Sequence, residues 1–187
     1  MQVLKEEIRK KILDVAENMF YQNGFEDTTT RNIAKEVGVS VSNLYLYYKN
    51  KETIFYEIID GFYKYFINSI ETFFKHDDSD NNMDASIGYF VKKIITTDRR
   101  KFVILCNRSK GTKYEGFKQQ IAGILNSHMK MQVKKDLIKD PLILDILAKN
   151  FIEGIIELAG NYKGECWLED SVNTLVKYHM KGMEQFM

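Results

Sequence analysis

A single proline, Pro141, occurs in 187 residues, and this scarcity restricts the possible folds more than any other feature of the sequence. Proline removes a backbone donor and stops a helix, so a chain with only one can sustain long helices. Hydrophobic residues make up 44% of the chain, which is enough to build a packed core. No segment alternates with the period of two that a half-buried strand requires. We therefore expect an all-α protein.

Apolar residues recur at spacings of three and four along most of the chain, which is typical of amphipathic helices. Asn23-Gly24 is expected to end the first helix, and Thr28 and Ser40 are expected to cap the next two. Asp140 before Pro141 predicts another helix start. The polar run 76–82 predicts a loop. The expected helices cover residues 1–22, 28–37, 41–48, 51–74, 84–97, 99–109, 114–138, 141–159 and 170–187.

Composition and spacing argue against several classes of protein. No run of eighteen apolar residues occurs and the N-terminus is highly charged, so we expect a soluble cytoplasmic protein without a membrane span or signal peptide. Cys106 and Cys166 lie 60 positions apart, and His76, His128 and His179 are scattered, so we expect no disulfide and no metal site. Nucleophile elbows, paired carboxylates and glycine-rich cofactor loops are missing from the sequence. We therefore expect neither an enzyme nor a cofactor.

Residues 28–48 have the layout of a helix-turn-helix, with a glycine-containing turn between two short helices. In such a unit the second helix enters the major groove of DNA, while hydroxyls and basic groups nearby contact phosphates. Residues 28–51 hold one arginine and three lysines against one glutamate, between acidic segments. An ordinary helical hairpin would have the same layout. The candidate DNA-binding residues are Thr28, Thr30, Arg31, Ser40, Val41, Ser42, Asn43, Tyr45, Leu46, Tyr47, Lys49 and Lys51.

The run GFEDTTTRNIAKEVGVSVSNLYLYYKNKETIF, residues 24–55, resembles the N-terminal DNA-binding domain of the TetR family of transcriptional regulators. The shared pattern is Gly-Phe, Thr, Ile-Ala, Gly-Val-Ser, Leu-Tyr and Lys-Glu. With the first helix, the resemblance covers about residues 5–60. Leu46 stands where histidine or tyrosine is frequent, and Tyr48 stands where phenylalanine is usual. We expect Tyr48 to pack and Leu46 to present an apolar group to the DNA.

The resemblance implies a homodimeric repressor that binds a palindromic operator and releases it when a small molecule binds. Residues 1–50 would form the DNA-binding domain, and residues 51–187 a helical domain for effector binding and dimerisation. The richness in aromatic residues suggests an apolar or aromatic effector. The candidate lining of its cavity is Phe62, Tyr63, Phe66, Phe90, Leu105, Cys106 and Phe117. The candidate dimer interface is Phe151, Ile152, Ile155, Ile156, Val172, Leu175, Val176 and His179.

Other interpretations remain open at this point. For any single apolar residue above, burial in an ordinary core is the simpler interpretation. Cys106 could make the protein a redox-responsive regulator of the same fold, although its apolar surroundings favour an inert thiol. A third alternative is an all-α ligand-binding or scaffold protein without DNA binding.

Overall fold

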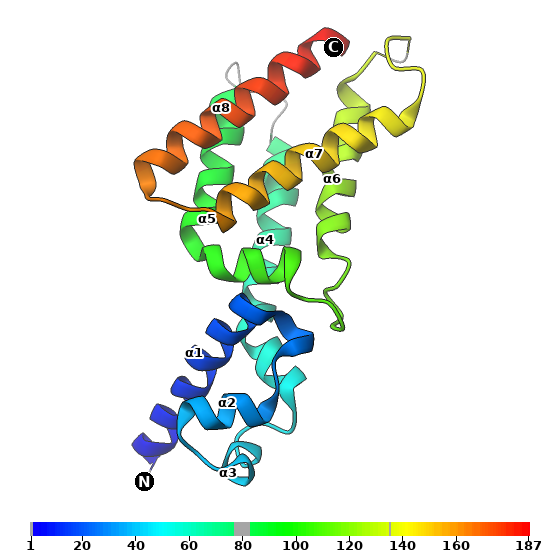
Figure 1. The fold of residues 1–187 in the computed structure, drawn as a ribbon. Coiled ribbons are helices and arrows are strands. Elements are labelled where there is room, and N and C mark those ends of the chain that lie inside the picture. Colours follow the sequence, from blue (N-terminus) through cyan, green and yellow to red (C-terminus); the bar gives the residue numbers. More distant parts are fainter. Residues whose placement is uncertain (1, 77–82, 135) are drawn as a thin grey trace.

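The computed structural model describes residues 2–76, 83–134 and 136–187, and within these ranges every regular element is a helix, as expected. A small head at one end of the molecule is joined by a long helix to a larger helical domain (Figure 1). Of the predicted loop at 76–82, only His76 is among the described residues, and it is the last residue of α4. The elements are α1 (Gln2–Asp27), α2 (Thr30–Val37), α3 (Val41–Tyr45), α4 (Lys51–His76), α5 (Met83–Asn107), α6 (Phe117–Gln132), α7 (Pro141–Gly160), α8 (Glu165–Met183) and the 3-10 helix η2 (Glu184–Phe186).

Two of the long helices contain a kink. In α1 the kink is at Gly24, whose φ of 84° and ψ of 169° are not helical, so the predicted break at this position is confirmed. In α5 the kink is at Asp98, with φ of −157° and ψ of 73°. The two helices expected at 84–97 and 99–109 are therefore the two arms of α5. Both arms keep a buried face, which is why their apolar periodicity is visible in the sequence.

Several predicted helix boundaries are wrong, because local hydrogen bonds compete with the helical ones. Thr29, not Thr28, caps α2: its side chain accepts from the backbone N–H of Asn32. Helix α3 ends at Tyr45 instead of residue 48. Helix α6 ends at Gln132 instead of residue 138. The backbone of Val133 is extended, and the backbone N–H of Lys134 donates to the carbonyl of Phe186 at 3.0 Å.

The starts of α6 and α8 also differ from the prediction. Helix α6 begins at Phe117, not at residue 114, because the Ser109 hydroxyl donates to the Tyr114 carbonyl at 3.0 Å and holds that segment in turns. Helix α8 begins at Glu165, five residues before the predicted start, directly after Gly164 with its φ of 123°. Burial of Leu168 explains the extra turn.

Helix α4 belongs to both parts of the molecule. At its start, Phe55 packs edge-on against Phe20 and Phe25 of α1, with ring centroids 5.1 Å apart in each pair. Further along, its buried residues Phe62 and Phe66 lie in the core of the larger domain. The expected division between residues 50 and 51 therefore crosses a shared core. A displacement of α4 in the larger domain would therefore also shift its contacts with the head.

Helices α7 and α8 cross closely at Gly154. A Cβ atom at this position would lie 3.0 Å from both terminal methyl carbons of Leu175. The absence of a side chain on Gly154 thus allows α8 to pack closely against α7. None of the described helices is long and apolar enough to span a bilayer.

Candidate DNA-binding surface and effector cavity

Side-chain caps fix the angle between α2 and α3. Thr29 Oγ1 accepts a hydrogen bond from the Asn32 N–H at 3.1 Å, and Ser40 Oγ accepts one from the Asn43 N–H at 3.1 Å. Between the two helices, Gly38 has the left-handed φ of 82°, and its N–H donates to the Ala34 carbonyl at 3.0 Å. These are the capping interactions expected at short helix ends. The predicted helix-turn-helix layout is present.

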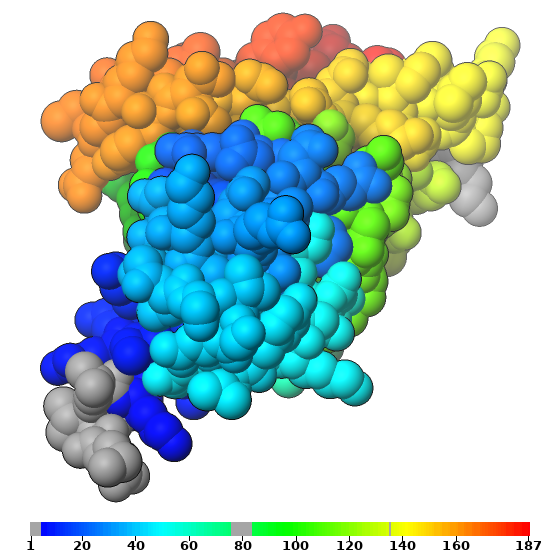
Figure 2. Space-filling model, turned by 60° about the horizontal axis from the view of Figure 1, so that its bottom comes forward, coloured from blue at the N-terminus to red at the C-terminus, as the bar shows by residue number. Residues whose placement is uncertain are grey.

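One face of α3 is buried and the other faces solvent. Leu44 is fully buried in the same apolar cluster as Ile33 and Ala34 of α2. On the other side, Ser42 is exposed, Tyr45 is 50% exposed and Leu46 is 83% exposed. This side lies at the far end of the head, which Figure 2 brings forward. The surface has the small and polar groups that close approach to base edges requires.

Most of the candidate DNA-binding residues lie together on this end of the head. The Tyr45 and Thr30 hydroxyl oxygens are 3.4 Å apart, a hydrogen bond that connects α3 to the first turn of α2. The residues that are exposed or partly exposed there are Thr30, Arg31, Ser40, Val41, Ser42, Asn43, Tyr45, Leu46, Tyr47 and Lys49. We call this set the recognition surface.

Thr28 does not fit the prediction. Its side chain is fully buried, and its hydroxyl donates to the Gly24 carbonyl at 2.7 Å. The hydroxyl therefore stabilises the kink of α1 and is not available for a phosphate.

Lys51 also has a different role from the one expected. Its Nζ donates to the carbonyls of Phe25 at 2.5 Å and Glu26 at 3.3 Å, and lies 4.1 Å from the centroid of the Phe25 ring. Partial burial lowers the pKa of Lys51 from its usual value. The ammonium group thus caps the last carbonyls of α1, where a cation is favoured.

The recognition surface is further attached to α1 and α4 through Tyr48. Tyr48 is buried, as expected, and its hydroxyl accepts a hydrogen bond from Arg9 Nε at 3.2 Å. Arg9 also donates to Glu57 of α4 at 2.9 Å, a hydrogen bond that raises the pKa of Arg9. Since Arg9 and Glu57 are exposed in this pair, the contribution to stability is small, but the geometry links α1, α4 and the segment between α3 and α4.

A cavity of about 70 Å³ lies in the larger domain between α4, α5, α6, α7 and α8. Its lining is almost entirely apolar, and aromatic rings and methionines predominate. The lining residues are Phe66, Ile70, Phe73, Phe74, Ile87, Phe90, Val91, Ile94, Phe102, Ile121, Leu125, His128, Met129, Gln132, Phe151, Ile152, Ile155, His179, Met180, Met183 and Met187.

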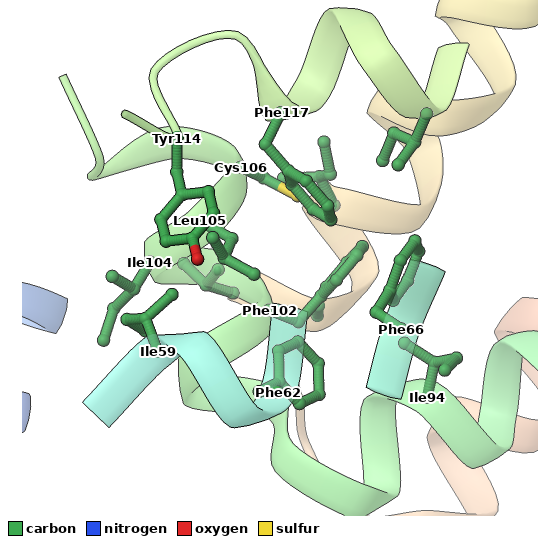
Figure 3. Packing of buried hydrophobic residues seen from close by; sticks show 14 of the residues in the cluster. Ile59, Phe62, Phe66, Ile94, Phe102, Ile104, Leu105, Cys106, Tyr114 and Phe117 are labelled. Atoms are coloured by element: carbon green, nitrogen blue, oxygen red, sulfur yellow. The ribbon is translucent and has the colours of Figure 1, made fainter. Parts of the chain in front are cut away.

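Only Phe66 and Phe90 of the seven predicted lining residues border this cavity. The other five belong to the packed core or lie against it, and the ring centroid of Tyr63 lies 4.5 Å from that of Tyr114 in the loop between α5 and α6. Figure 3 shows Cys106 beside Phe117, with Leu105 and Phe62 in the same packed region. The five that do not line the cavity are Phe62, Tyr63, Leu105, Cys106 and Phe117. Sequence periodicity identifies an apolar face but cannot tell a filled core from a void in it.

The burial of Cys106 also bears on redox chemistry. Its side chain is 8% exposed, and burial raises the pKa of its thiol. The thiolate is the reactive form, so this cysteine is expected to be inert. The redox-responsive alternative therefore gains no support from Cys106. Among the residues that the structure describes, no group of three or more His, Cys, Asp or Glu side chains has the arrangement of a metal site.

Two imidazoles border the cavity. His128 stacks on Phe74 and His179 stacks on Phe151, with ring centroids 4.2 Å apart in both pairs. Burial lowers the pKa of His179 to about 4, so this ring is neutral at pH 7. The described lining contains no lysine, arginine or carboxylate. A ligand of this cavity would find apolar contacts and no opposite charge.

Most of the predicted dimer residues are buried within the single chain. Phe151, Ile152, Ile155, Ile156, Val172 and Val176 are each at most 8% exposed, so they belong to the core and the prediction for them is wrong. Leu175 and His179 are partly exposed. The apolar residues of α7 and α8 that do face solvent are Leu142, Ile143, Ile146 and Tyr178. The predicted dimer residues thus lie mostly on the faces of α7 and α8 that are buried in this chain.

A comparison with known proteins agrees with this geometry. The model of the family "Bacterial regulatory proteins, tetR family" matches residues 12–58, which contain α2, α3 and the start of α4. The biofilm operon regulator IcaR of Staphylococcus epidermidis is 29% identical over 93 residues, which are 50% of this chain and 49% of IcaR. The chain thus matches only about half the length of its curated relatives.

Solved structures extend the likeness in fold to nearly the whole chain. A TetR-like regulator from Rhodococcus sp. RHA1 has a TM-score of 0.63 at 17% identity, covering 94% of this chain and 96% of that one. AibR, crystallised with isovaleryl coenzyme A and operator DNA, has a TM-score of 0.60 at 17% identity, covering 89% and 96%. At these identities the solved structures show a likeness in fold alone. Residues 12–58 thus match the helix-turn-helix domain of the TetR family, and the remainder of the chain is similar to these regulators in fold.

Proposed function

We propose that the chain is a cytoplasmic repressor that binds a palindromic operator as a homodimer and releases it when a neutral, apolar small molecule enters the cavity. The observation that carries this proposal is the continuity of α4. Its first turn is fixed to the head by Lys51, and its later residue Phe66 borders the cavity. The names of IcaR, a negative transcriptional regulator, and of AibR, solved with a ligand and operator DNA, support it.

In this proposal the recognition surface enters the major groove. Ser42 and Asn43 would contact base edges, while Arg31 and Lys49 would contact phosphates. Lys51 is left out of the phosphate contacts, because its ammonium group is occupied by the carbonyls of α1.

The effector would have to enlarge the cavity. Sites for drug-sized ligands have volumes of roughly 300–1,000 Å³, and the cavity here is about 70 Å³. Met129, Met180, Met183 and Met187 form part of the wall, and methionine side chains rearrange easily. A ligand that displaces Phe66 would move α4 and with it the head. A coupling of about 1–3 kcal/mol would lower operator affinity roughly 5- to 150-fold.

The homodimer would form through α7 and α8, with the exposed side chains in place of the buried ones first expected. Ile143, Ile146 and Tyr178 leave apolar surface in solvent, and a shallow groove beside Tyr178 is bordered by Leu147 and Phe186. A two-fold axis there would place two heads about 34 Å apart or slightly more on successive turns of DNA.

Two measurements on the full chain test this function together. A panel of uncharged lipophilic compounds is screened for a rise in melting temperature, since a ligand of the native state stabilises it by mass action. Any compound found is then added to a mobility-shift assay with the DNA beside the gene. We expect the chain to bind the DNA when no compound is present and to release it when the compound is added. Ligand binding without any DNA binding would instead support the ligand-binding or scaffold alternative.

A further inference from the structure

Leu46 is exposed in a way that the fold does not require. Its side chain is 83% exposed, the highest value among the large hydrophobic residues that the structure describes as exposed. It directly follows α3, and its φ of −72° and ψ of −20° continue the helical turn. Its own N–H donates to the Asn43 carbonyl at 3.0 Å, so the backbone position is well fixed.

The direction of Leu46 follows from helical periodicity. Residues three and four apart share a helix face, so Leu46 lies on the same face as Asn43 and Ser42. Leu44 and Tyr48, two positions away on each side, are buried and face the core of the head. Leu46 therefore belongs to the recognition surface at the end of α3, and its side chain points away from the protein.

The surroundings of Leu46 favour DNA over a protein as its partner. The neighbouring exposed side chains include the hydroxyl of Ser42 and the charged groups of Arg31 and Lys49. Leu46 and the half-exposed ring of Tyr45 beside it form too small an apolar area for a protein interface, which needs on the order of 800 Å² from each partner. In the major groove, by contrast, the C5-methyl group of thymine is a single apolar feature among donors and acceptors.

We infer that Leu46 determines sequence specificity by packing on the C5-methyl group of one thymine in each half-site. This inference rests on the proposed DNA binding and adds a chemical identity to one base. Leu46 makes no hydrogen bond through its side chain, so it selects the base by the methyl group alone. Ser42 and Asn43 would read the neighbouring base edges through hydrogen bonds.

The test removes one methyl group at a time from the DNA. A preferred duplex is first selected from a randomised pool with the full-length chain. Each thymine is then replaced by deoxyuridine, which pairs identically and lacks only the methyl group, and the Kd is measured by fluorescence anisotropy. We expect one position per half-site where the wild-type Kd rises by about 3- to 10-fold, the value of one buried methyl group. Leu46→Ala should bind the thymine and deoxyuridine duplexes at that position equally.

Two further variants test whether the penalty requires an apolar side chain at Leu46 and whether it is specific to this position. Leu46→Met keeps an apolar side chain and should retain most of the deoxyuridine penalty. Tyr89→Ala, at another exposed apolar position on α5, should behave as the wild type. Because Leu46 is exposed, the melting temperature of Leu46→Ala should match that of the wild type. The inference is overturned if no thymine shows a penalty, or if Leu46→Ala keeps the full penalty. If no duplex is selected at all, the proposed DNA binding itself fails.

Discussion

At the scale of single residues, Lys51 connects the head to the first turn of α4. Its ammonium group donates hydrogen bonds to two carbonyls at the end of α1 and lies over the ring of Phe25. A charged hydrogen bond of this kind contributes about 1.5–3 kcal/mol when the acceptors are removed from water. In the sequence alone, Lys51 and Lys49 have equivalent positions beside a recognition helix, and only the structure separates them.

Substitution of these two lysines should therefore give different results. Lys51→Met keeps the aliphatic stem and loses the hydrogen bonds, so we expect the free energy of unfolding to fall by about 1–3 kcal/mol. Lys49→Ala should leave stability unchanged and lower the slope of log K against log salt by about one unit, as loss of a phosphate contact does. Chemical denaturation and DNA titrations at several salt concentrations measure both. Equal stability of the two variants would refute the capping role.

His179 should make stability depend on pH. Burial lowers the pKa of His179 to about 4 in the folded chain, against about 6.5 for an unfolded histidine. As pH falls below 6.5, the unfolded chain takes up a proton that the folded chain does not. The free energy of unfolding therefore decreases, by about 1–2 kcal/mol at pH 5.

The variant His179→Phe keeps a ring against Phe151 and removes this titration. Denaturation curves of both proteins at pH 7 and pH 5 give the comparison, since all other ionisable groups are common to the two. We expect a smaller loss of stability for the variant. An identical loss in both proteins would show that His179 titrates normally.

At the scale of elements, the kink of α1 gives the head its shape. Gly24 has φ of 84° and ψ of 169°, a conformation almost restricted to glycine. After the kink, the Phe25 N–H donates to the Arg108 carbonyl at 2.9 Å, which attaches α1 to the loop between α5 and α6. The backbone conformation here, and not the available space, limits the side chain, because a Cβ on Gly24 would lie 3.8 Å from its nearest neighbours.

Alanine at two glycines should therefore have opposite effects. We expect Gly24→Ala to cost about 1–3 kcal/mol of stability through backbone strain. Gly61→Ala, in the interior of α4 with nothing within 4 Å of the new Cβ, should add about 0.5–1 kcal/mol through helix propensity. Melting temperatures of the two variants decide the point. A shift of both in the same direction would contradict the assigned role of Gly24.

The elements themselves were largely predictable from the sequence, and their ends and outward faces were not. Period and capping residues located the helices, including the break at Gly24 and the caps at Ser40 and Asp140. Thr28 was misassigned because two adjacent threonines offer the same side-chain oxygen, and tertiary burial chooses between them. The dimer residues were wrong because α7 is apolar around most of its surface, so that periodicity alone cannot say which stripe faces the core.

The cavity was only partly predictable for a related reason. A void is a property of several helices together, and its position depends on packing that no single helix encodes. The methionines and Gln132 of the wall come from α6, α8 and the C-terminal end, which the aromatic pattern did not indicate. The one usable signal is the spacing of Met180, Met183 and Met187, three and four residues apart in the sequence.

At the scale of the whole molecule, the cavity should tolerate additional volume where the packed core does not. Val91 borders the cavity, so Val91→Leu should leave stability equal or raise it by up to about 1 kcal/mol. Cys106 lies in filled core, so Cys106→Leu should lower stability by about 1–3 kcal/mol. Val91→Leu should also reduce the thermal shift caused by an effector. Equal destabilisation by both substitutions would mean that the cavity is not available to a ligand.

The central claim is that the recognition surface reads DNA sequence, and a ratio of two affinities tests it most directly. The Kd of the full chain for its selected palindromic duplex is compared with the Kd for a scrambled duplex at 150 mM salt. We predict a ratio of at least about 10³, reduced by roughly 5- to 150-fold in Asn43→Ala and unchanged in Tyr89→Ala. Equal affinity of the wild-type chain for both duplexes would contradict the account.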